Sequence, residues 1–296
     1  MKLRRIWSDE LAGPQLRALQ AGGWQDAADQ DGLANATGSM PRGSAATPMA
    51  LLPFEPLSFR DFMLYEKHVI DSTRGYVRRF MPGTYRVARA YERVTGQTFP
   101  RFKPKPLWYR QPIYYMSNHL SFVASGVPVR TPAYTTALDY ELELGFVLSR
   151  PLFNASPEQA LGAIGAFVVL CDFSARDIQR EEMESGFGPQ KAKHFLSSMS
   201  CTAATADEIL PKVQQLQATV EIDGNVVVRT STSGMQHTLG EVLAHASREE
   251  HLYPGELFGT GTLPGGSGLE NGHWLRPGCE LRLTIDGVGE IRHRID

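Results

Sequence analysis

The sequence predicts a β-rich mixed α+β fold, because its predicted strands outnumber its helices and pair mostly through hairpins. An Asp-Gly turn lies between two apolar segments within 218–230, and a second one does so within 281–295. An alternating segment over 138–148 predicts a strand, and a continuous apolar run over 161–170 predicts a buried strand or a short buried helix. This arrangement argues against a doubly wound parallel sheet.

The first 55 residues differ in composition from the rest of the chain. A short helix is expected over 10–25, although Pro14 and two glycines interrupt it. A stretch rich in Ala, Gly, Ser and Thr follows, and such a composition has little apolar surface to bury. We therefore expect residues 1–55 to form a short N-terminal arm or cap, partly flexible, and residues 56–296 to form one domain.

Three later segments show helical spacing. Residues 58–69 mix apolar and charged side chains at that spacing, and Ser58 with Asp61 has the spacing of an N-cap pair. Residues 86–95 predict a short amphipathic helix, which a proline-punctuated, aromatic-rich loop follows. Residues 238–251 predict the third helix.

Composition excludes several classes of partner. The chain has 30 Lys and Arg against 32 Asp and Glu, so no basic field exists to hold nucleic acid or anionic lipid. Its three widely spaced cysteines exclude a disulfide scaffold and a cysteine-based zinc site. The N-terminus lacks the apolar run of a signal peptide, and no apolar run is long enough to span a bilayer. We expect a cytoplasmic protein that binds a small molecule, with no nucleic-acid or membrane partner.

The strand predicted at Asp139–Gly145 carries acidic residues on one face, because Asp139, Glu141 and Glu143 alternate with an apolar set. A solvated face is the ordinary explanation. However, Glu is a poor strand former, and like charges about 7 Å apart repel each other. A divalent cation would remove that repulsion, and ligation by oxygen alone suits Mg²⁺, Mn²⁺ or Ca²⁺. Asp172, at the end of the apolar run, offers a further carboxylate.

Other local motifs exclude common enzyme classes. Ser174 and Asp177 have the spacing of a helix capping pair, which does not account for Arg176 or Gln179. The glycine-rich segment 259–268 is neither a P-loop nor a dinucleotide fingerprint, because neither Lys-Ser/Thr nor a helical pattern follows it. Gly-x-Ser-x-Gly and His-Glu-x-x-His are absent, so an ordinary serine hydrolase and a zincin are not expected.

Five segments, taken in order, resemble the catalytic domain of the fumarylacetoacetate hydrolase family. They are Asp61-Phe-Met with His68, Tyr115 with the Ala-Ser-Gly-Val-Pro-Val-Arg-Thr-Pro segment after it, Asp139-Tyr-Glu-Leu-Glu-Leu, Asp172-Phe-Ser-Ala-Arg-Asp-Ile-Gln with Lys193, and Gly261-Thr262 with Glu270. The resemblance spans residues 58–290 and implies the fold of that domain, a β-rich mixed sheet or β-sandwich roll. It also implies a homodimer.

The resemblance further implies a role for each matched residue. The metal ligands would be Asp61, Glu141, Glu143 and Asp172, around Mg²⁺ or else Mn²⁺ or Ca²⁺. His68 would be the general base, oriented by Glu270. Positive charge and hydrogen-bond donors for the developing enolate or carboxylate would come from Arg176, Gln179 and Lys193. Substrate contacts would come from Tyr115, Met63, Met183 and Thr262.

The chain departs from that family at two kinds of position. Met63 and Met183 stand where members that cleave fumarylacetoacetate carry substrate-contacting tyrosines. No residue matches the expected carboxylate-binding arginine, for which Arg74, Arg78 and Arg79 are candidates. Fumarylacetoacetate itself is therefore not the expected substrate.

The resemblance implies a metal-dependent hydrolase that cleaves a carbon–carbon bond in a β-diketone or acylpyruvate-like acid. The metal would favour the substrate's enolate, while His68 and Glu270 would activate water. An alternative is a decarboxylase, tautomerase or hydratase-type enzyme that acts on a 2-oxo acid through the same metal-bound enolate. A non-catalytic member of the family is a third hypothesis.

Overall fold

The computed structural model describes residues 1–8, 13–27 and 51–296 and confirms a mixed α+β fold. The large sheet contains, from one edge to the other, β3 (Gly23–Asp26), β2 (Gly13–Gln20), β1 (Lys2–Ser8), β12 (Thr202–Thr205), β9 (Ile164–Asp172), β8 (Glu141–Leu148), β15 (Leu257–Ser267), β4 (Phe59–Phe62) and β5 (Tyr114–Ser117). Beside β9, β11 (Ser197–Met199) pairs with β6 (Phe122–Ala124). This sheet is mixed, because β4 runs parallel to β15 and β6 runs parallel to β11.

A second, antiparallel sheet contains β14 (Asn225–Ser231), β13 (Gln217–Ile222), β16 (Glu280–Ile285) and β17 (Gly289–Arg294) in that order. A short pair joins β7 (Leu138–Asp139) to β10 (Ser174–Ala175). The α-helices are α1 (Glu66–Phe80), α2 (Pro82–Thr95), α3 (Pro106–Arg110), α4 (Pro157–Leu161), α5 (Arg176–Glu184), α6 (Ala206–Ile209), α7 (Leu239–Ala246) and α8 (Gly268–Asn271). Three 3₁₀ turns are η1 (Pro100–Phe102), η2 (His119–Ser121) and η3 (Leu210–Lys212).

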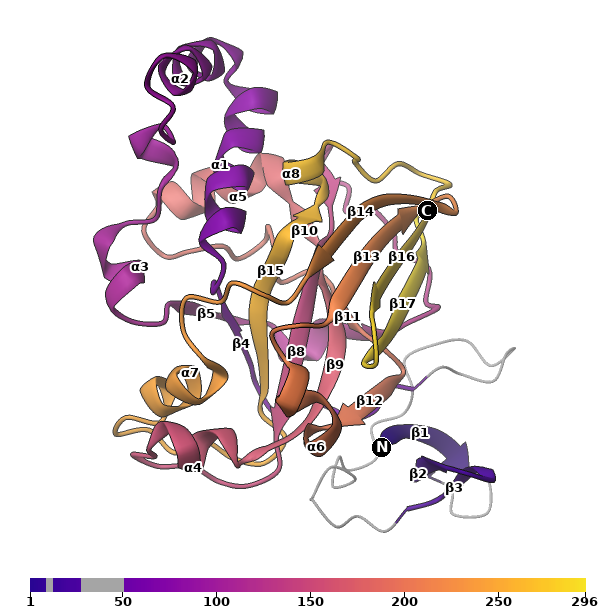
Figure 1. The fold of residues 1–296 in the computed structure, drawn as a ribbon. Helices are drawn as coiled ribbons and strands as arrows, with labels where there is room; N and C mark the ends of the chain where they lie inside the picture. The colour runs from indigo at the N-terminus through magenta and orange to yellow at the C-terminus, as the bar shows by residue number, and fades with distance from the viewer. Residues whose placement is uncertain (9–12, 28–50) are drawn as a thin grey trace.

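The main core lies between the two sheets. Leu142 and Leu144 of β8 are fully buried there, in one apolar cluster with Val220 of β13 and Leu283 of β16. Full burial of each such side chain stabilises the fold by roughly 1.5–3 kcal/mol. Figure 1 shows α1, α2, α5 and α8 at one end of the large sheet, with α4 and α7 at its other end. No helix in the described ranges is long and apolar enough to cross a membrane.

Most of the predicted elements are confirmed. Both hairpins form, as β13–β14 and as β16–β17. The alternating segment is β7 and β8, the apolar run is part of β9 from residue 164 onward, and the helix predicted over 86–95 lies within α2. Residues 239–246 are helical, and Thr238 and Glu241 cap this helix through a reciprocal capping box.

The helix predicted over 10–25 is wrong in its described part, because residues 13–20 and 23–26 are strands. β2 pairs with β1, which pairs with β12 far along the chain, so tertiary pairing overrides the local pattern. Leu3 and Leu16 are buried in a smaller core on the other face of the sheet. The composition of residues 28–50 supported a flexible arm, and that segment lies outside the described residues. The domain division at residue 55 stays a prediction.

The helix predicted over 58–69 is also wrong for its first half. Residues 59–62 form β4, and α1 begins only at Glu66. Ser58 does not cap a helix, because its Oγ donates a hydrogen bond of 2.7 Å to Glu256. Asp61 lies within β4, where its neighbours in the sheet are Gly259 of β15 and Tyr115 of β5. Asp61 thus lies on the second strand from one edge of the large sheet, between β15 and β5.

Candidate active site

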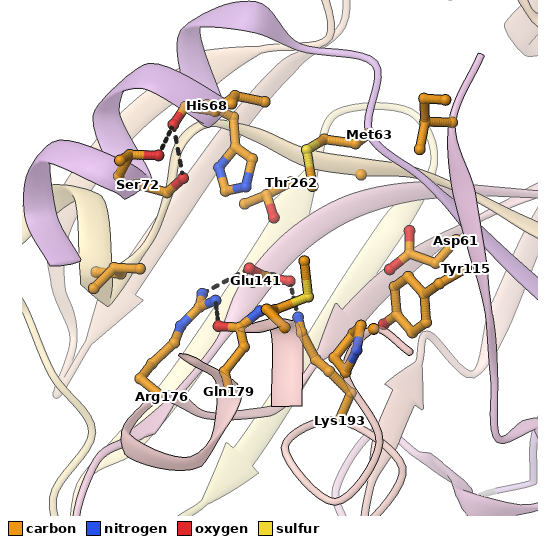
Figure 2. Close-up of a pocket in the computed structure, with 18 of the residues that line it drawn as sticks. Asp61, Met63, His68, Ser72, Tyr115, Glu141, Arg176, Gln179, Lys193 and Thr262 are labelled. Atoms are coloured by element: carbon orange, nitrogen blue, oxygen red, sulfur yellow. Dashed lines mark hydrogen bonds and ion pairs between the residues drawn. The ribbon is translucent and has the colours of Figure 1, made fainter. Parts of the chain in front are cut away.

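A cavity of about 600 Å³ lies where β4, β5, β8 and β15 meet α1 and α5. Figure 2 shows His68 and Ser72 on one side of it, Arg176, Gln179 and Lys193 on another side, and Glu141 between them. Predicted site residues that line the cavity are Asp61, Met63, His68, Tyr115, Glu141, Glu143, Arg176, Gln179, Met183, Lys193 and Thr262. Asp172 and Glu270 are not among the lining residues, but Asp172 pairs with Lys193 and Glu270 pairs with His68. The structure therefore brings the predicted metal ligands and catalytic and substrate-contacting residues to one place.

The four predicted metal ligands come from three strands of the large sheet and are nearly inaccessible to solvent. Asp61 on β4 is 4% exposed, Glu141 and Glu143 on β8 are 5% and 1% exposed, and Asp172 at the end of β9 is 1% exposed. The acidic face of β8 is thus buried, and its ordinary explanation as a solvated face is wrong.

Several carboxylate oxygens have no partner. Asp61 Oδ1 and both carboxylate oxygens of Glu143 are buried without a hydrogen bond from any described residue. Burial and the nearby charge of Asp172 raise the pKa of Asp61 to about 8. Burial and the charge of Asp61 raise the pKa of Glu143 well above its ordinary value. Such groups are costly to ionise unless a cation stands beside them.

Lys193 supplies one such cation. Its Nζ lies 2.9 Å from Asp172 Oδ2 and also forms an ion pair with Glu141. Burial opposes the charged ammonium, but Asp172 and Glu141 raise the pKa of Lys193. Burial likewise opposes ionisation of Glu141, and Arg176 and Lys193 hold its pKa below the ordinary value. Glu141 thus has two cationic partners, whereas Asp61 and Glu143 form no ion pair with a described residue.

The donor set fits a hard divalent cation. In this structure, however, the carboxylates do not form a complete coordination sphere. Among the described residues, no three ligand side chains stand together at ligating distance. The unpartnered oxygens of Asp61 and Glu143 are nonetheless the type of donor that Mg²⁺ or Mn²⁺ takes. A methyl group at Gly259 would lie 2.7 Å from Asp61 Oδ1 and 2.7 Å from Glu143 Oε2. The absence of a side chain at Gly259 keeps the space between these oxygens open.

His68 and Glu270 approach each other because α1 and α8 are packed unusually close. A methyl group at Gly75 of α1 would lie 1.8 Å from the carbonyl oxygen of Leu269, so only glycine allows this contact. His68 Nδ1 then lies 3.0 Å from Glu270 Oε2, within ion-pair distance but not aligned as a hydrogen bond. Burial favours the neutral imidazole, but Glu270 raises the pKa of His68 above its ordinary value.

Glu270 is itself fixed in place. Gly265 N–H donates to its Oε1 at 2.9 Å, and Ser267 Oγ donates to its Oε2 at 2.8 Å. A buried histidine with an oriented carboxylate behind it is the arrangement of a general base and its orienting group. The His68 ring lines the cavity and can therefore exchange a proton with a bound molecule.

Asp139 has a role that sequence reasoning missed. It is fully buried and accepts a hydrogen bond of 2.8 Å from Arg176 Nε. It also accepts hydrogen bonds from the backbone N–H groups of Gly268 and Leu269, at the start of α8. Asp139 therefore joins the arginine on α5 to the helix that carries Glu270. Its alternation with Glu141 and Glu143 was the available signal.

Arg176 donates hydrogen bonds to three side chains. Besides Asp139, it donates 2.6 Å to Glu141 Oε1 and 2.9 Å to the side-chain oxygen of Gln179. Tyr115, predicted to contact substrate, donates its hydroxyl to Asp172 Oδ2 at 2.6 Å. These side chains orient the carboxylates of Glu141 and Asp172.

Two further predictions from the sequence fail. Ser174 and Asp177 do not cap α5, since the helix begins without a side-chain cap and Asp177 accepts instead from the backbone N–H of Thr136. None of the candidate carboxylate-binding arginines lines the cavity. Arg74 pairs with Asp71 and Glu92, Arg78 donates to the backbone of Glu270, and Arg79 lies over the ring of Trp274.

Comparison with known proteins gives a consistent match. The family model described as Fumarylacetoacetate (FAA) hydrolase C-terminal matches residues 83–296. Asp61, Met63 and His68 precede the matched range. The mitochondrial oxaloacetate tautomerase of Homo sapiens is 28% identical over 186 residues, which cover 63% of this chain and 81% of that protein. A putative hydrolase of Burkholderia cenocepacia is 30% identical over 185 residues, covering 61% of this chain and 64% of its own length.

Solved structures match along the whole chain. The fumarylacetoacetate hydrolase of Exiguobacterium antarcticum has a TM-score of 0.70 at 20% identity, covering 100% of this chain and 99% of its own. The 5-carboxymethyl-2-hydroxymuconate delta-isomerase of Mycobacterium smegmatis has a TM-score of 0.66 at 19% identity, covering 100% and 98%. At such identities the likeness shows the fold alone.

Proposed function

The chain belongs to the fumarylacetoacetate hydrolase family, and on that premise we propose that it is a divalent-metal-dependent hydrolase of a carbon–carbon bond. The substrate would be a β-diketone or an acylpyruvate-like acid. The observation that carries this proposal is the buried pair of His68 and Glu270, 3.0 Å apart, beside a cluster of buried carboxylates in the same cavity. The pair is suited to proton abstraction, and the cluster is suited to a hard cation.

Asp61, Glu141, Glu143 and Asp172 would hold the cation, with Mg²⁺ or Mn²⁺ preferred over Ca²⁺. When bound, it would supply a Lewis acid that polarises the oxygens of the substrate. Its binding would require Lys193 to yield its place between Glu141 and Asp172, or to share these carboxylates with the metal. Lys193 and Arg176 would then supply positive charge at the cavity wall, where negative charge develops on the substrate.

His68 would remove a proton from a water molecule, and Glu270 would stabilise the resulting imidazolium. The hydroxide would attack the carbonyl carbon next to the bond that breaks, and the electron pair of that bond would pass to the departing enolate. His68 would return its proton to this enolate carbon. Water and the diketo acid are thereby converted into two acids, with no oxidant or reductant.

Metal-stripped protein, supplied with Mg²⁺ or Mn²⁺ and a panel of 2,4-dioxo acids, tests this proposal through the loss of enol absorbance. We expect metal-dependent loss that His68→Ala lowers about 10²-fold to 10⁴-fold, the usual effect of removing a general base. Equal rates for His68→Ala and the unchanged protein would contradict the mechanism.

A tautomerase acting on a 2-oxo acid is the second candidate, and the related oxaloacetate tautomerase favours it. The same His68 could move a proton between carbon and solvent without attack by water. Isotope labelling separates the two reactions. Both reactions place solvent deuterium at the carbon beside the keto group, but only hydrolysis places one solvent ¹⁸O in a product acid by cleavage.

Two further assignments belong to this proposal. We infer a reducing compartment such as the cytoplasm, because all three cysteines are unpaired and two are buried. We also infer a homodimer, which the resemblance to the family implies. Sedimentation of the purified protein would test the dimer, with a single species of one-chain mass as the contradicting result.

A further inference from the structure

The cavity continues outward beyond the carboxylates into a compartment with a different chemical character. We call it the apolar chamber and define it by Met63, Val69, Tyr76, Ile113, Met183 and Pro189. These residues come from α1, α5 and the segments next to β4 and β5. Carbon and sulfur atoms therefore form most of the chamber wall.

Two hydroxyl groups of α1 that line the cavity have their protons already engaged, those of Ser72 and Thr73. Ser72 Oγ donates to the carbonyl oxygen of Val69 at 3.2 Å, and Thr73 Oγ1 donates to the same oxygen at 2.7 Å. Figure 2 shows Ser72 and the dashed line to this oxygen beside His68. Ser72 and Thr73 therefore offer no free proton to a ligand, although they line the cavity.

Every cation that lines the described cavity already has a carboxylate partner. Arg176 pairs with Asp139 and Glu141, and Lys193 pairs with Glu141 and Asp172. At the mouth, Arg180 pairs with Glu184 one turn along the same helix, at 2.6 Å. Arg176 and Lys193 are therefore committed to buried carboxylates, and Arg180, in its solvent-exposed pair, is not one of the six residues that define the chamber.

From these observations we propose that the substrate carries an uncharged apolar chain or ring at the end remote from its 2-oxo acid group. The proposal rests on the proposed function for the position of that acid group. A cavity of about 600 Å³ is of the size that holds drug-sized ligands and exceeds the needs of a small dicarboxylic acid. Met63 and Met183, flexible and polarisable, suit contact with alkyl or aryl groups.

A chain-length series tests this proposal. The probes are 2,4-dioxo acids whose 4-alkyl group grows from methyl to pentyl, together with the pentyl acid that bears a terminal carboxylate. We expect kcat/KM to rise about threefold to fourfold for each added methylene. The terminal carboxylate is expected to lower it at least about tenfold, since the charge would be placed among apolar side chains without a partner.

A matched pair of variants locates the effect in the chamber. Met183 and Met116 are both half exposed, at 50% and 49%, but Met116, on β5, does not line the cavity. Met183→Lys should reduce the preference for the pentyl acid over its carboxylated analogue at least about tenfold, because it supplies the missing cation. Met116→Lys should leave that preference within about twofold. Equal effects of the two variants would overturn the proposal.

A binding measurement keeps this proposal separate from the proposed reaction. Saturated 2-oxo acids of increasing length lack the 4-oxo group needed for cleavage, and their affinity in the presence of Mg²⁺ can be measured by calorimetry. Affinity that rises with chain length supports the apolar chamber even if no dioxo acid is cleaved. Affinity that is independent of length, or a preference for the carboxylated acid, overturns the chamber and leaves the reaction standing.

Discussion

The strands and the helices that border the cavity differ in how exposed their side chains are. The carboxylates on β4, β8 and β9 are 1–5% exposed and fixed by strand pairing on both sides. On α5, Met183 is 50% exposed and contributes to the apolar part of the cavity wall. This difference suggests a division of work, in which the sheet holds the carboxylates for the cation, the helices supply His68, Glu270 and Arg176, and the exposed part of α5 contacts the remote end of the substrate. A rigid sheet suits the first task because catalytic groups need precise placement.

The largest effect is expected when a carboxylate of the sheet is neutralised. Glu143→Gln should lower kcat/KM at least about 10³-fold, because it removes a ligand charge from the cation. The same change should leave the metal-free protein as stable as before or more stable, since both oxygens of Glu143 are buried without partners. Thermal melting with and without Mg²⁺ measures this. A Glu143→Gln protein that keeps its activity would refute the assignment.

A second prediction concerns pH and the base. His68 must be neutral to accept a proton, and Glu270 raises its pKa, so the rate should increase with pH through a pKa above the ordinary value of about 6.5. Glu270→Gln removes the charge that favours imidazolium, and it should move this acidic limb to lower pH while lowering the plateau rate about a hundredfold.

The control for this prediction is Glu158→Gln on α4, at the other end of the large sheet. It should leave both the limb and the plateau where they were. If Glu270→Gln and Glu158→Gln gave the same pH profile, Glu270 would not be the orienting group.

The space beside the carboxylates gives a third test. Gly259→Ala should weaken Mn²⁺ binding about tenfold to a hundredfold, because the methyl group would lie 2.7 Å from Asp61 Oδ1 and from Glu143 Oε2. Gly83→Ala on α2 adds a methyl group with no atom within 4 Å and serves as the control. It should stabilise the protein by about 0.5–1 kcal/mol without changing Mn²⁺ binding. Similar Mn²⁺ affinities for the two variants would contradict this account.

The smallest effect is expected at Tyr115. Its hydroxyl donates 2.6 Å to Asp172, and one such hydrogen bond contributes about 0.5–1.5 kcal/mol. Tyr115→Phe should therefore weaken metal binding only about threefold to tenfold, with the apolar selectivity unchanged. A change in chain-length preference without a change in metal affinity would make Tyr115 a substrate contact, as the sequence predicted.

The sequence predicted the acidic strand because alternation is a local property of the chain. The carboxylates of Glu141 and Glu143 follow from the period of two, whatever the rest of the fold does. The structural role of Asp139 could not be predicted in this way, because its hydrogen-bond partners Gly268 and Leu269 are about 130 residues away in the sequence. The β1–β12 pairing likewise joins segments about 200 residues apart and overrides a local helical pattern at the N-terminus.

His68 and Asp61 also show what a local pattern cannot predict. The resemblance placed both in the site, yet the helical spacing around them was extended too far toward the N-terminus. Asp61 lies on a strand because β15 and β5 pair with β4 on its two sides. No short-range pattern encodes those partners.

The most direct test is the position of Mn²⁺ in crystals of the protein, found by anomalous diffraction. We predict one strong peak in contact with Glu143 and Asp61, together with Glu141 and Asp172, and a displaced or shared Lys193 ammonium. No peak among these carboxylates in an active, Mn²⁺-loaded crystal, with Lys193 still between Glu141 and Asp172, would contradict the central claim that the sheet carries the metal centre.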